Sequence, residues 1–218
     1  MTENTNVPKV AELFCGIGGF RLASDNLDLR TVFANDLDVT ACNVYKHNFG
    51  SDGLFVGDIN HFKDKVPDHD ILTAGFPCQP FSSAGKKKGI EDIRGTLFES
   101  IADILFQKKP KMFVLENVKR LLSMQNGLHF STILRTLNNA GYSVEWCLLN
   151  AVKFGLPQHR ERVVLVGYRN NTTNLCFLPN LVQRFHNGDG FDVPSKWSPL
   201  GDKNKFHSWG LALNLVAA

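Results

Sequence analysis

The residues Val10-Ala11-Glu12-Leu13-Phe14-Cys15-Gly16-Ile17-Gly18-Gly19 form a short apolar run that ends in a glycine turn. Six further apolar runs follow along the chain, at residues 31–34, 54–56, 71–75, 112–115, 144–149 and 163–168. Longer segments separate them, and residues 96–107 and 128–139 carry apolar side chains at helical spacing. This alternation is typical of βαβ units, so we predict an α/β fold with a doubly wound, mostly parallel sheet.

The composition fits a globular domain. The chain has 218 residues, of which 43% are hydrophobic and 21% are charged, enough to bury a sizeable core. No apolar run approaches the roughly 20 residues needed to cross a bilayer, and the first residues lack the pattern of a signal peptide. We therefore expect a cytoplasmic protein that has no membrane partner.

The cysteines and the net charge exclude little on their own. Five cysteines occur without a Cys-x-x-Cys pair, so neither a disulfide framework nor a metal site is expected. The net charge of +3 is only a weak indication of nucleic-acid binding.

A domain boundary is predicted near residue 172, where the regular alternation stops. Residues 1–172 would form the main domain, and residues 173–218 are too few for a second domain of typical size. We interpret the latter as a tail or as the beginning of a truncated region.

Polar residues follow five of the apolar runs, where ligands bind in open parallel sheets. They are the glycine turn, then residues 35–38, 57–58, 76–79 and 116–117. Asp36 lies 20 positions after Gly16, which is typical of an acid that holds ribose hydroxyls. Arg21 stands where a dinucleotide fingerprint needs a third glycine, so a nucleoside cofactor other than NAD is favoured. A tight strand-to-helix turn without a ligand is the alternative.

Cys78 and Glu116 are the candidate reactive side chains. Pro77 and Pro80 flank Cys78 in a turn, and we expect a cation such as Arg160 or Lys86 to lower the pKa of its thiol. Glu116 follows an apolar strand, where poor solvation would raise its pKa and let it donate a proton. The alternatives are a buried structural cysteine and, for Glu116, a helix cap or an ion pair with Lys119.

Four motifs together resemble the DNA (cytosine-5)-methyltransferases. They occur in the family's order at residues 14–20 (FCGIGGF), 75–82 (GFPCQPFS), 116–118 (ENV) and 158–162 (QHRER). The resemblance covers roughly residues 9–170 and implies the Rossmann-like fold of class I S-adenosylmethionine-dependent methyltransferases. It also implies double-stranded DNA as the partner.

The resemblance assigns roles to individual residues. It implies that Cys78 attacks C6 of a flipped-out cytosine, that Glu116 holds the N3 edge, and that Arg160 and Arg162 grip the base. The S-adenosylmethionine pocket would be formed by Phe14, Gly16, Gly18, Gly19, Asp36, Leu37, Asp58, Ile59 and Pro77. Ser82, Lys86, Lys87 and Lys88 would contact DNA phosphates.

The chain also departs from the family pattern. Glu12 replaces a usual aspartate, Asp36 and Leu37 replace a common glutamate and tryptophan, and the family's late Arg-x-x-Thr-x-x-Glu and Gly-Asn-Ser segments are missing. We therefore expect activity only with a complementing part, such as a second polypeptide. The alternatives are an inactive S-adenosylmethionine- or DNA-binding fragment, a transfer-RNA cytosine-5 methyltransferase, and a cysteine hydrolase that uses Cys78 with His159.

Overall fold

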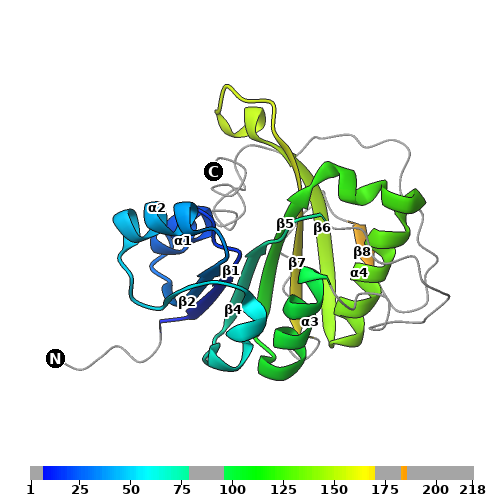
Figure 1. Cartoon of the computed structure of the whole chain (residues 1–218). Helices are drawn as coiled ribbons and strands as arrows, with labels where there is room; N and C mark the ends of the chain where they lie inside the picture. Colours follow the sequence, from blue (N-terminus) through cyan, green and yellow to red (C-terminus); the bar gives the residue numbers. More distant parts are fainter. Residues whose placement is uncertain (1–6, 79–95, 170–182, 186–218) are drawn as a thin grey trace.

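The chain folds into a mixed α/β structure around one twisted sheet (Figure 1). The structure is a computed structural model, and it describes residues 7–78, 96–169 and 183–185. The strands lie in the order β3-β2-β1-β4-β5-β7-β6-β8. Their bounds are β1 Lys9–Leu13, β2 Arg30–Asp36, β3 Leu54–Val56, β4 Ile71–Gly75, β5 Met112–Val118, β6 Tyr142–Asn150, β7 Glu161–Arg169 and β8 Gln183–Phe185.

Helices connect these strands. The α-helices are α1 Gly19–Asp25, α2 Val39–Phe49, α3 Leu97–Lys108 and α4 Leu128–Asn139. The short 3-10 helices are η1 Ile59–His61, η2 Lys63–Lys65, η4 Lys119–Leu122, η5 Met124–Gly127 and η6 Ala151–Phe154. The predicted α/β architecture is confirmed, and the seven predicted strands and two predicted helices occur within three residues of their expected bounds.

The sheet is parallel in its first part and antiparallel in its second. Strands β3, β2, β1, β4 and β5 pair in parallel, whereas β7 pairs antiparallel with both β5 and β6. Strands β6 and β7 are antiparallel because only residues 151–160 connect them. A connection of this length suits a hairpin, whereas a parallel crossover needs a dozen or more residues. This hairpin extends beyond the edge of the sheet in Figure 1.

Helices pack on both faces of the sheet, and strand side chains alternate between them. Phe113 and Leu115 of β5 face the core formed with α3 and α4, whereas Val114 faces the core that contains Phe20 and Ala23 of α1. This arrangement is the doubly wound sandwich that the alternating apolar runs predicted.

The strand order reverses between β1 and β4. The chain runs outward through β2 and β3 and returns to β4 on the other side of β1. Ligands in such sheets bind at this reversal, beyond the carboxyl ends of the strands. The turn after β1 carries Gly16, and the loop after β4 carries Cys78, so two of the predicted site segments are neighbours.

The last described strand belongs to the same sheet as the others. Strand β8, for which no strand was predicted, pairs antiparallel with β6, so residues 183–185 join the same sheet as the predicted main domain. The boundary near residue 172 falls outside the described residues. Among the described residues, no helix is both long and apolar enough to span a membrane.

Candidate active site

The glycine turn after β1 is fastened to the end of β2. The Gly16 backbone N–H donates to Asp36 Oδ2 at 2.7 Å, and the Cys15 N–H donates to the Asn35 carbonyl at 3.0 Å. Gly18 has a φ of 99°, and a Cβ placed there would lie 2.3 Å from Phe49 Cε2 of α2. The turn therefore requires glycine at this position for both its conformation and its space.

The predicted cofactor residues lie at the ends of four neighbouring strands, β3, β2, β1 and β4. Asp36 ends β2 and Leu37 follows it with 70% of its surface exposed, whereas Asp58 follows β3 and caps η1 through the Asn60 N–H at 2.9 Å. Ile59 is only 2% exposed and packs in the core. The carboxylates suit the hydroxyls of a nucleoside, and the exposed apolar side chain suits its flat base. Contact with a cofactor stays a prediction for all of these residues.

The loop that carries Cys78 is held by the neighbouring strand. Asn117 of β5 is 1% exposed, and its side-chain amide donates to the Phe76 carbonyl at 2.8 Å. Pro77 is exposed beside it. Sequence reasoning gave Asn117 no role, although it belongs to the ENV motif, because the partner of its amide becomes visible only when β4 and β5 pair.

The thiol of Cys78 contacts Met124, a second residue that the sequence did not single out. Sγ donates to the Met124 thioether sulfur at 2.8 Å. Met124 begins η5, and the two residues after it, Gln125 and Asn126, have φ values of 47° and 54°, which are uncommon for residues other than glycine. A constrained turn therefore places Met124 against the predicted nucleophile.

The expected activation of Cys78 by Arg160 or Lys86 is not what the structure shows. Burial raises the pKa of the Cys78 thiol, and the cation that lowers it is Arg120 of η4. Lys86 lies outside the described residues. The prediction of a lowered pKa is therefore wrong for this state, because desolvation of the thiolate outweighs the attraction of one guanidinium.

Glu116 of β5 forms an ion pair with Arg162 of the neighbouring strand β7. Arg162 Nε lies 2.7 Å from Glu116 Oε1, and both side chains are largely buried. Burial raises the pKa of Glu116 although Arg162 and Arg160 lower it, which confirms the predicted direction. The alternative ion pair with Lys119 is wrong, since Lys119 pairs with Glu161 at 2.8 Å.

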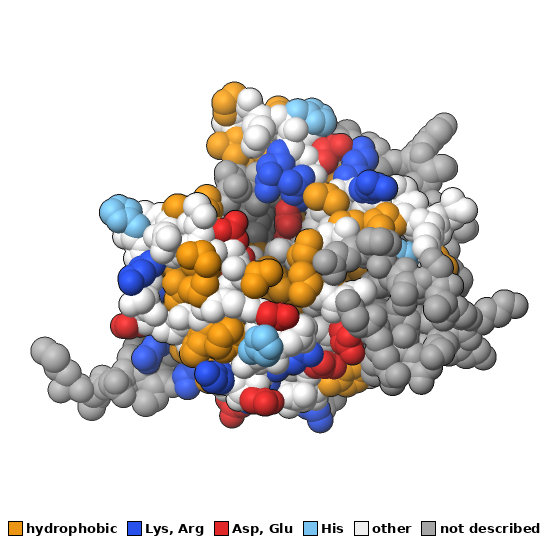
Figure 2. Space-filling view, in the orientation of Figure 1, with side chains coloured by type: hydrophobic (Ala, Val, Ile, Leu, Met, Phe, Trp, Pro, Cys, Tyr) orange, Lys and Arg blue, Asp and Glu red, His pale blue; other side chains and the backbone are white. Residues whose placement is uncertain are grey.

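The β5–β4 pairing brings Glu116 close to the Cys78 loop. Gly75 is the register partner of Glu116, and a Cβ on Gly75 would lie 3.6 Å from Glu116 Oε2. Arg160 is half-buried, and within the described part of the chain its Nε has no hydrogen-bond partner. Figure 2 shows Lys and Arg side chains gathered below the β6–β7 hairpin, where they border a hollow in this face. The site at this edge of the sheet is therefore cationic and partly shielded from water.

His159 is exposed in the β6–β7 connection, and the described part of the chain shows Cys78 against Met124 instead of a histidine. A cysteine hydrolase needs a base in contact with its thiol, so the geometry gives that alternative no support. The predicted DNA contacts Ser82, Lys86, Lys87 and Lys88 lie outside the described residues.

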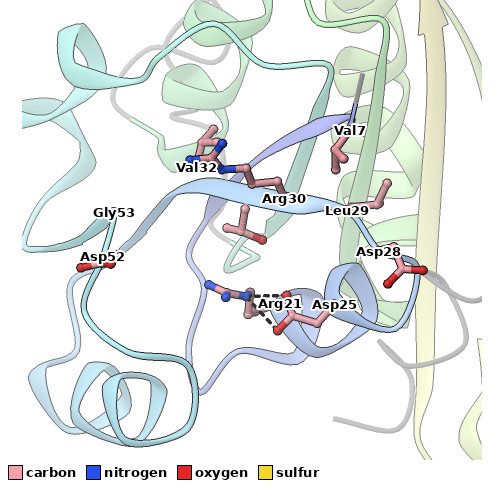
Figure 3. Close-up of a pocket in the computed structure, with 10 residues that line it drawn as sticks. Val7, Arg21, Asp25, Asp28, Leu29, Arg30, Val32, Asp52 and Gly53 are labelled. Atoms are coloured by element: carbon pink, nitrogen blue, oxygen red, sulfur yellow. Dashed lines mark hydrogen bonds and ion pairs between the residues drawn. The ribbon is translucent and has the colours of Figure 1, made fainter. Parts of the chain in front are cut away.

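A cavity of about 650 Å³ lies elsewhere, near the amino end of β2 (Figure 3). Arg21 and Asp25 of α1 line it together with Arg30 and Thr31 of β2. Arg21 is already paired with Asp25 at 2.8 Å. The cavity contains none of the predicted site residues.

Residues 8–202 match the family model described as C-5 cytosine-specific DNA methylase. The chain belongs to this family. The match covers most of the chain, including β8 and every segment that carries a predicted site residue.

The methylase relatives are type II enzymes. The chain is 51% identical to the type II methyltransferase M.NgoBI of Neisseria gonorrhoeae over 75% of its own length and 51% of that protein. It is 47% identical to M.HhaI of Haemophilus parahaemolyticus, over 73% of this chain and 49% of the relative. The chain thus spans about half the length of these methylase relatives.

Solved structures of methylases share the fold. A DNMT2 mutant of Spodoptera frugiperda superposes with a TM-score of 0.61 at 30% identity, over 76% of this chain and 51% of the other. The Dnmt2 methyltransferase of S. pombe gives a TM-score of 0.62 at 26% identity, with coverages of 77% and 53%.

Proposed function

We propose that the chain is the catalytic core of an enzyme that transfers a methyl group from S-adenosylmethionine to C5 of a flipped-out cytosine in double-stranded DNA. The observation that carries the proposal is the pairing of β4 with β5 at the strand-order reversal. Gly75 lies opposite Glu116, and Asn117 holds the Phe76 carbonyl at 2.8 Å, so Cys78 and Glu116 belong to one edge of the sheet.

In the proposed reaction, Cys78 loses its proton to water and the thiolate Sγ forms a bond with C6 of the cytosine, so that the electrons of the C5–C6 double bond make C5 nucleophilic. Glu116 donates a hydrogen bond or proton at N3, and burial favours the protonated carboxyl because it raises the pKa of Glu116. After methylation, water takes the proton from C5, the C6–S bond breaks and Cys78 leaves as the thiolate, while N3 returns any proton that it received to Glu116. Arg162 Nε, 2.7 Å from Glu116 Oε1, holds this carboxyl in place.

S-adenosylmethionine supplies an electrophilic methyl group on a sulfonium. The fit of this cofactor rests on the glycine turn, on the carboxylates of Asp36 and Asp58, and on the exposed side chain of Leu37. Asp36 would accept ribose hydroxyls while it holds the Gly16 N–H, because a carboxylate oxygen can accept more than one hydrogen bond. Phe14, Gly18, Gly19, Ile59 and Pro77 complete the proposed pocket.

The proposal includes a complementing part. Because this chain spans about half of its relatives, the recognition of a DNA sequence is assigned to segments beyond the matched part, on the same or a second polypeptide. Ser82 and the lysines 86–88 remain proposed phosphate contacts.

The experiment is a radiolabel transfer assay. The chain is incubated with labelled S-adenosylmethionine and DNA from a host without cytosine methylation, alone and with the C-terminal half of M.NgoBI supplied in trans. Label in DNA that requires Cys78 supports the proposal, and a Cys78→Ser variant is the control. The N-terminal half of M.NgoBI serves as the positive control, and no label with this chain while that half is active would contradict the proposal. In a parallel mixture with transfer RNA in place of DNA, label in the RNA alone would identify the RNA enzyme.

Isothermal titration with S-adenosylmethionine separates a binding fragment from an enzyme. Binding that Asp36→Ala weakens, without methyl transfer in either mixture, would indicate the inactive fragment.

A further inference from the structure

Glu12 is a buried acid beneath the glycine turn. It lies on β1, two residues before Phe14, and has 0% of its surface exposed. Ala11 and Leu13 pack in the core on the α3 and α4 side, so the alternation of β1 points Glu12 to the opposite face. No role in the proposed reaction has been given to this carboxyl.

The groups around Glu12 come from three segments. The Tyr45 hydroxyl of α2 donates to Glu12 Oε2 at 3.3 Å, while Arg21 and Asp25 of α1 and the Cys15 thiol are the other titratable groups that act on it. Its neighbours in the sheet, Ala34 and Thr73, carry no charge. Within the described part of the chain, Glu12 Oε1 has no partner at hydrogen-bond geometry, although the Arg21 backbone N–H lies near enough to the carboxyl to lower its pKa.

The same groups shape the glycine turn. The Arg21 guanidinium lies 5.4 Å from the centre of the Phe49 ring, and Tyr45 is among the groups that raise its pKa. Phe49 and Tyr45 are the side chains that leave no room for a Cβ on Gly18. A change at Glu12 therefore affects the glycine turn through the contacts of Arg21 on α1 and of Tyr45 and Phe49 on α2.

We propose that Glu12 is a positioning residue for the cofactor turn, which as a neutral acid joins β1 to α1 and α2, and that its ionisation loosens residues 14–19 and weakens the binding of S-adenosylmethionine. A carboxylate with one oxygen unpaired and buried is costly, so the charged form favours a state in which water reaches it. Burial raises the pKa of Glu12 to about 8, which places this change just above neutral pH.

The test is hydrogen exchange of the peptide that contains residues 14–22, followed from pH 6.5 to 9.5 and corrected for the intrinsic exchange rate. In the wild-type chain, protection of the turn is expected to fall several-fold as the pH passes 8. Glu12→Gln keeps the shape without the charge and is expected to keep its protection. Tyr45→Phe removes the hydroxyl and is expected to lower protection already at pH 7.

The matched control is Glu145→Gln, which replaces another buried glutamate on β6, away from the turn. It is expected to leave the pH profile of residues 14–22 unchanged. A wild-type profile without a step, or a step of the same size in Glu12→Gln, would overturn the proposal. If Glu12→Gln does not fold, the wild-type and Tyr45→Phe profiles decide.

Cofactor affinity is the second readout, and it depends on the proposed function. The dissociation constant of S-adenosylmethionine is expected to rise several-fold between pH 7 and pH 9 in the wild type but not in Glu12→Gln. Absence of binding at every pH would contradict the proposed pocket, whereas the exchange profile would still decide the role of Glu12. Binding that weakens equally in both chains would contradict the role of Glu12 and leave the pocket intact.

Discussion

Arg162 and Glu116 form an ion pair of 2.7 Å that joins the second residue of β7 to the fifth residue of β5. The antiparallel pairing of these strands makes the contact possible, since Val118 is the register partner of Arg162 and Glu116 lies two residues before it. The pair fixes the carboxyl at the edge where Cys78 follows β4.

The first prediction concerns that carboxyl. Glu116→Gln in the complemented methylase should lower the rate of methyl transfer by at least about a hundredfold, since glutamine cannot transfer a proton at N3. The neighbouring Glu161→Gln breaks only the more exposed pair with Lys119 and should change the rate less than about threefold, as expected for a surface ion pair. Equal losses in both variants would refute the role of Glu116.

The second prediction concerns the fastening of the Cys78 loop. Asn117→Ala should lower the free energy of unfolding by about 1–3 kcal/mol, because the buried Phe76 carbonyl then lacks a donor. Urea denaturation measures the change. Asn139→Ala, at the exposed end of α4, should remain within about 0.5 kcal/mol of the wild type. A neutral Asn117→Ala would show that the loop is held by other contacts.

The third prediction concerns the contact between Met124 and Cys78. Met124→Ala should raise the rate at which iodoacetamide alkylates Cys78, because the thioether no longer covers the sulfur or accepts its hydrogen. Peptide mass spectrometry follows the labelling site by site. Cys147 is an internal control, since burial raises its pKa to about 12 and it should stay unlabelled in both chains. An unchanged rate at Cys78 would mean that Met124 does not restrict the thiol.

The fourth prediction concerns stability and pH. Glu12 has a pKa of about 8 in the folded chain and an ordinary value of 4.5 when unfolded. Between these values the folded chain keeps a proton that the unfolded chain releases, so its contribution to stability is complete below pH 4.5 and is lost as the pH rises to 8. The difference in unfolding free energy between wild type and Glu12→Gln should therefore change by about 1.4 kcal/mol per pH unit in this window. A constant difference from pH 5 to 8 would contradict the buried neutral acid.

Local sequence determined the elements of this fold. The runs at residues 54–56 and 71–75 match β3 and β4 without error, because short apolar segments bounded by turn residues have few other ways to bury their side chains. Helix α4 also matches its predicted bounds, and Gly141 after it was the signal that ended the pattern. The direction of the Glu116 pKa followed from its place on an apolar strand.

The tertiary structure decided which distant groups meet. The sequence placed Lys119 near Glu116 because the two are close along the chain, but strand pairing gave Glu116 to Arg162 and Lys119 to Glu161. Arg120 in place of Arg160 is the cation that lowers the pKa of Cys78, Met124 contacts its sulfur, and Asn117 holds its loop. Motifs and periodicity depend on local backbone preference and burial, which the order of residues encodes directly. Ion pairs and thiol contacts depend on strand register and on the path of η4 and η5, which exist only once the sheet has formed.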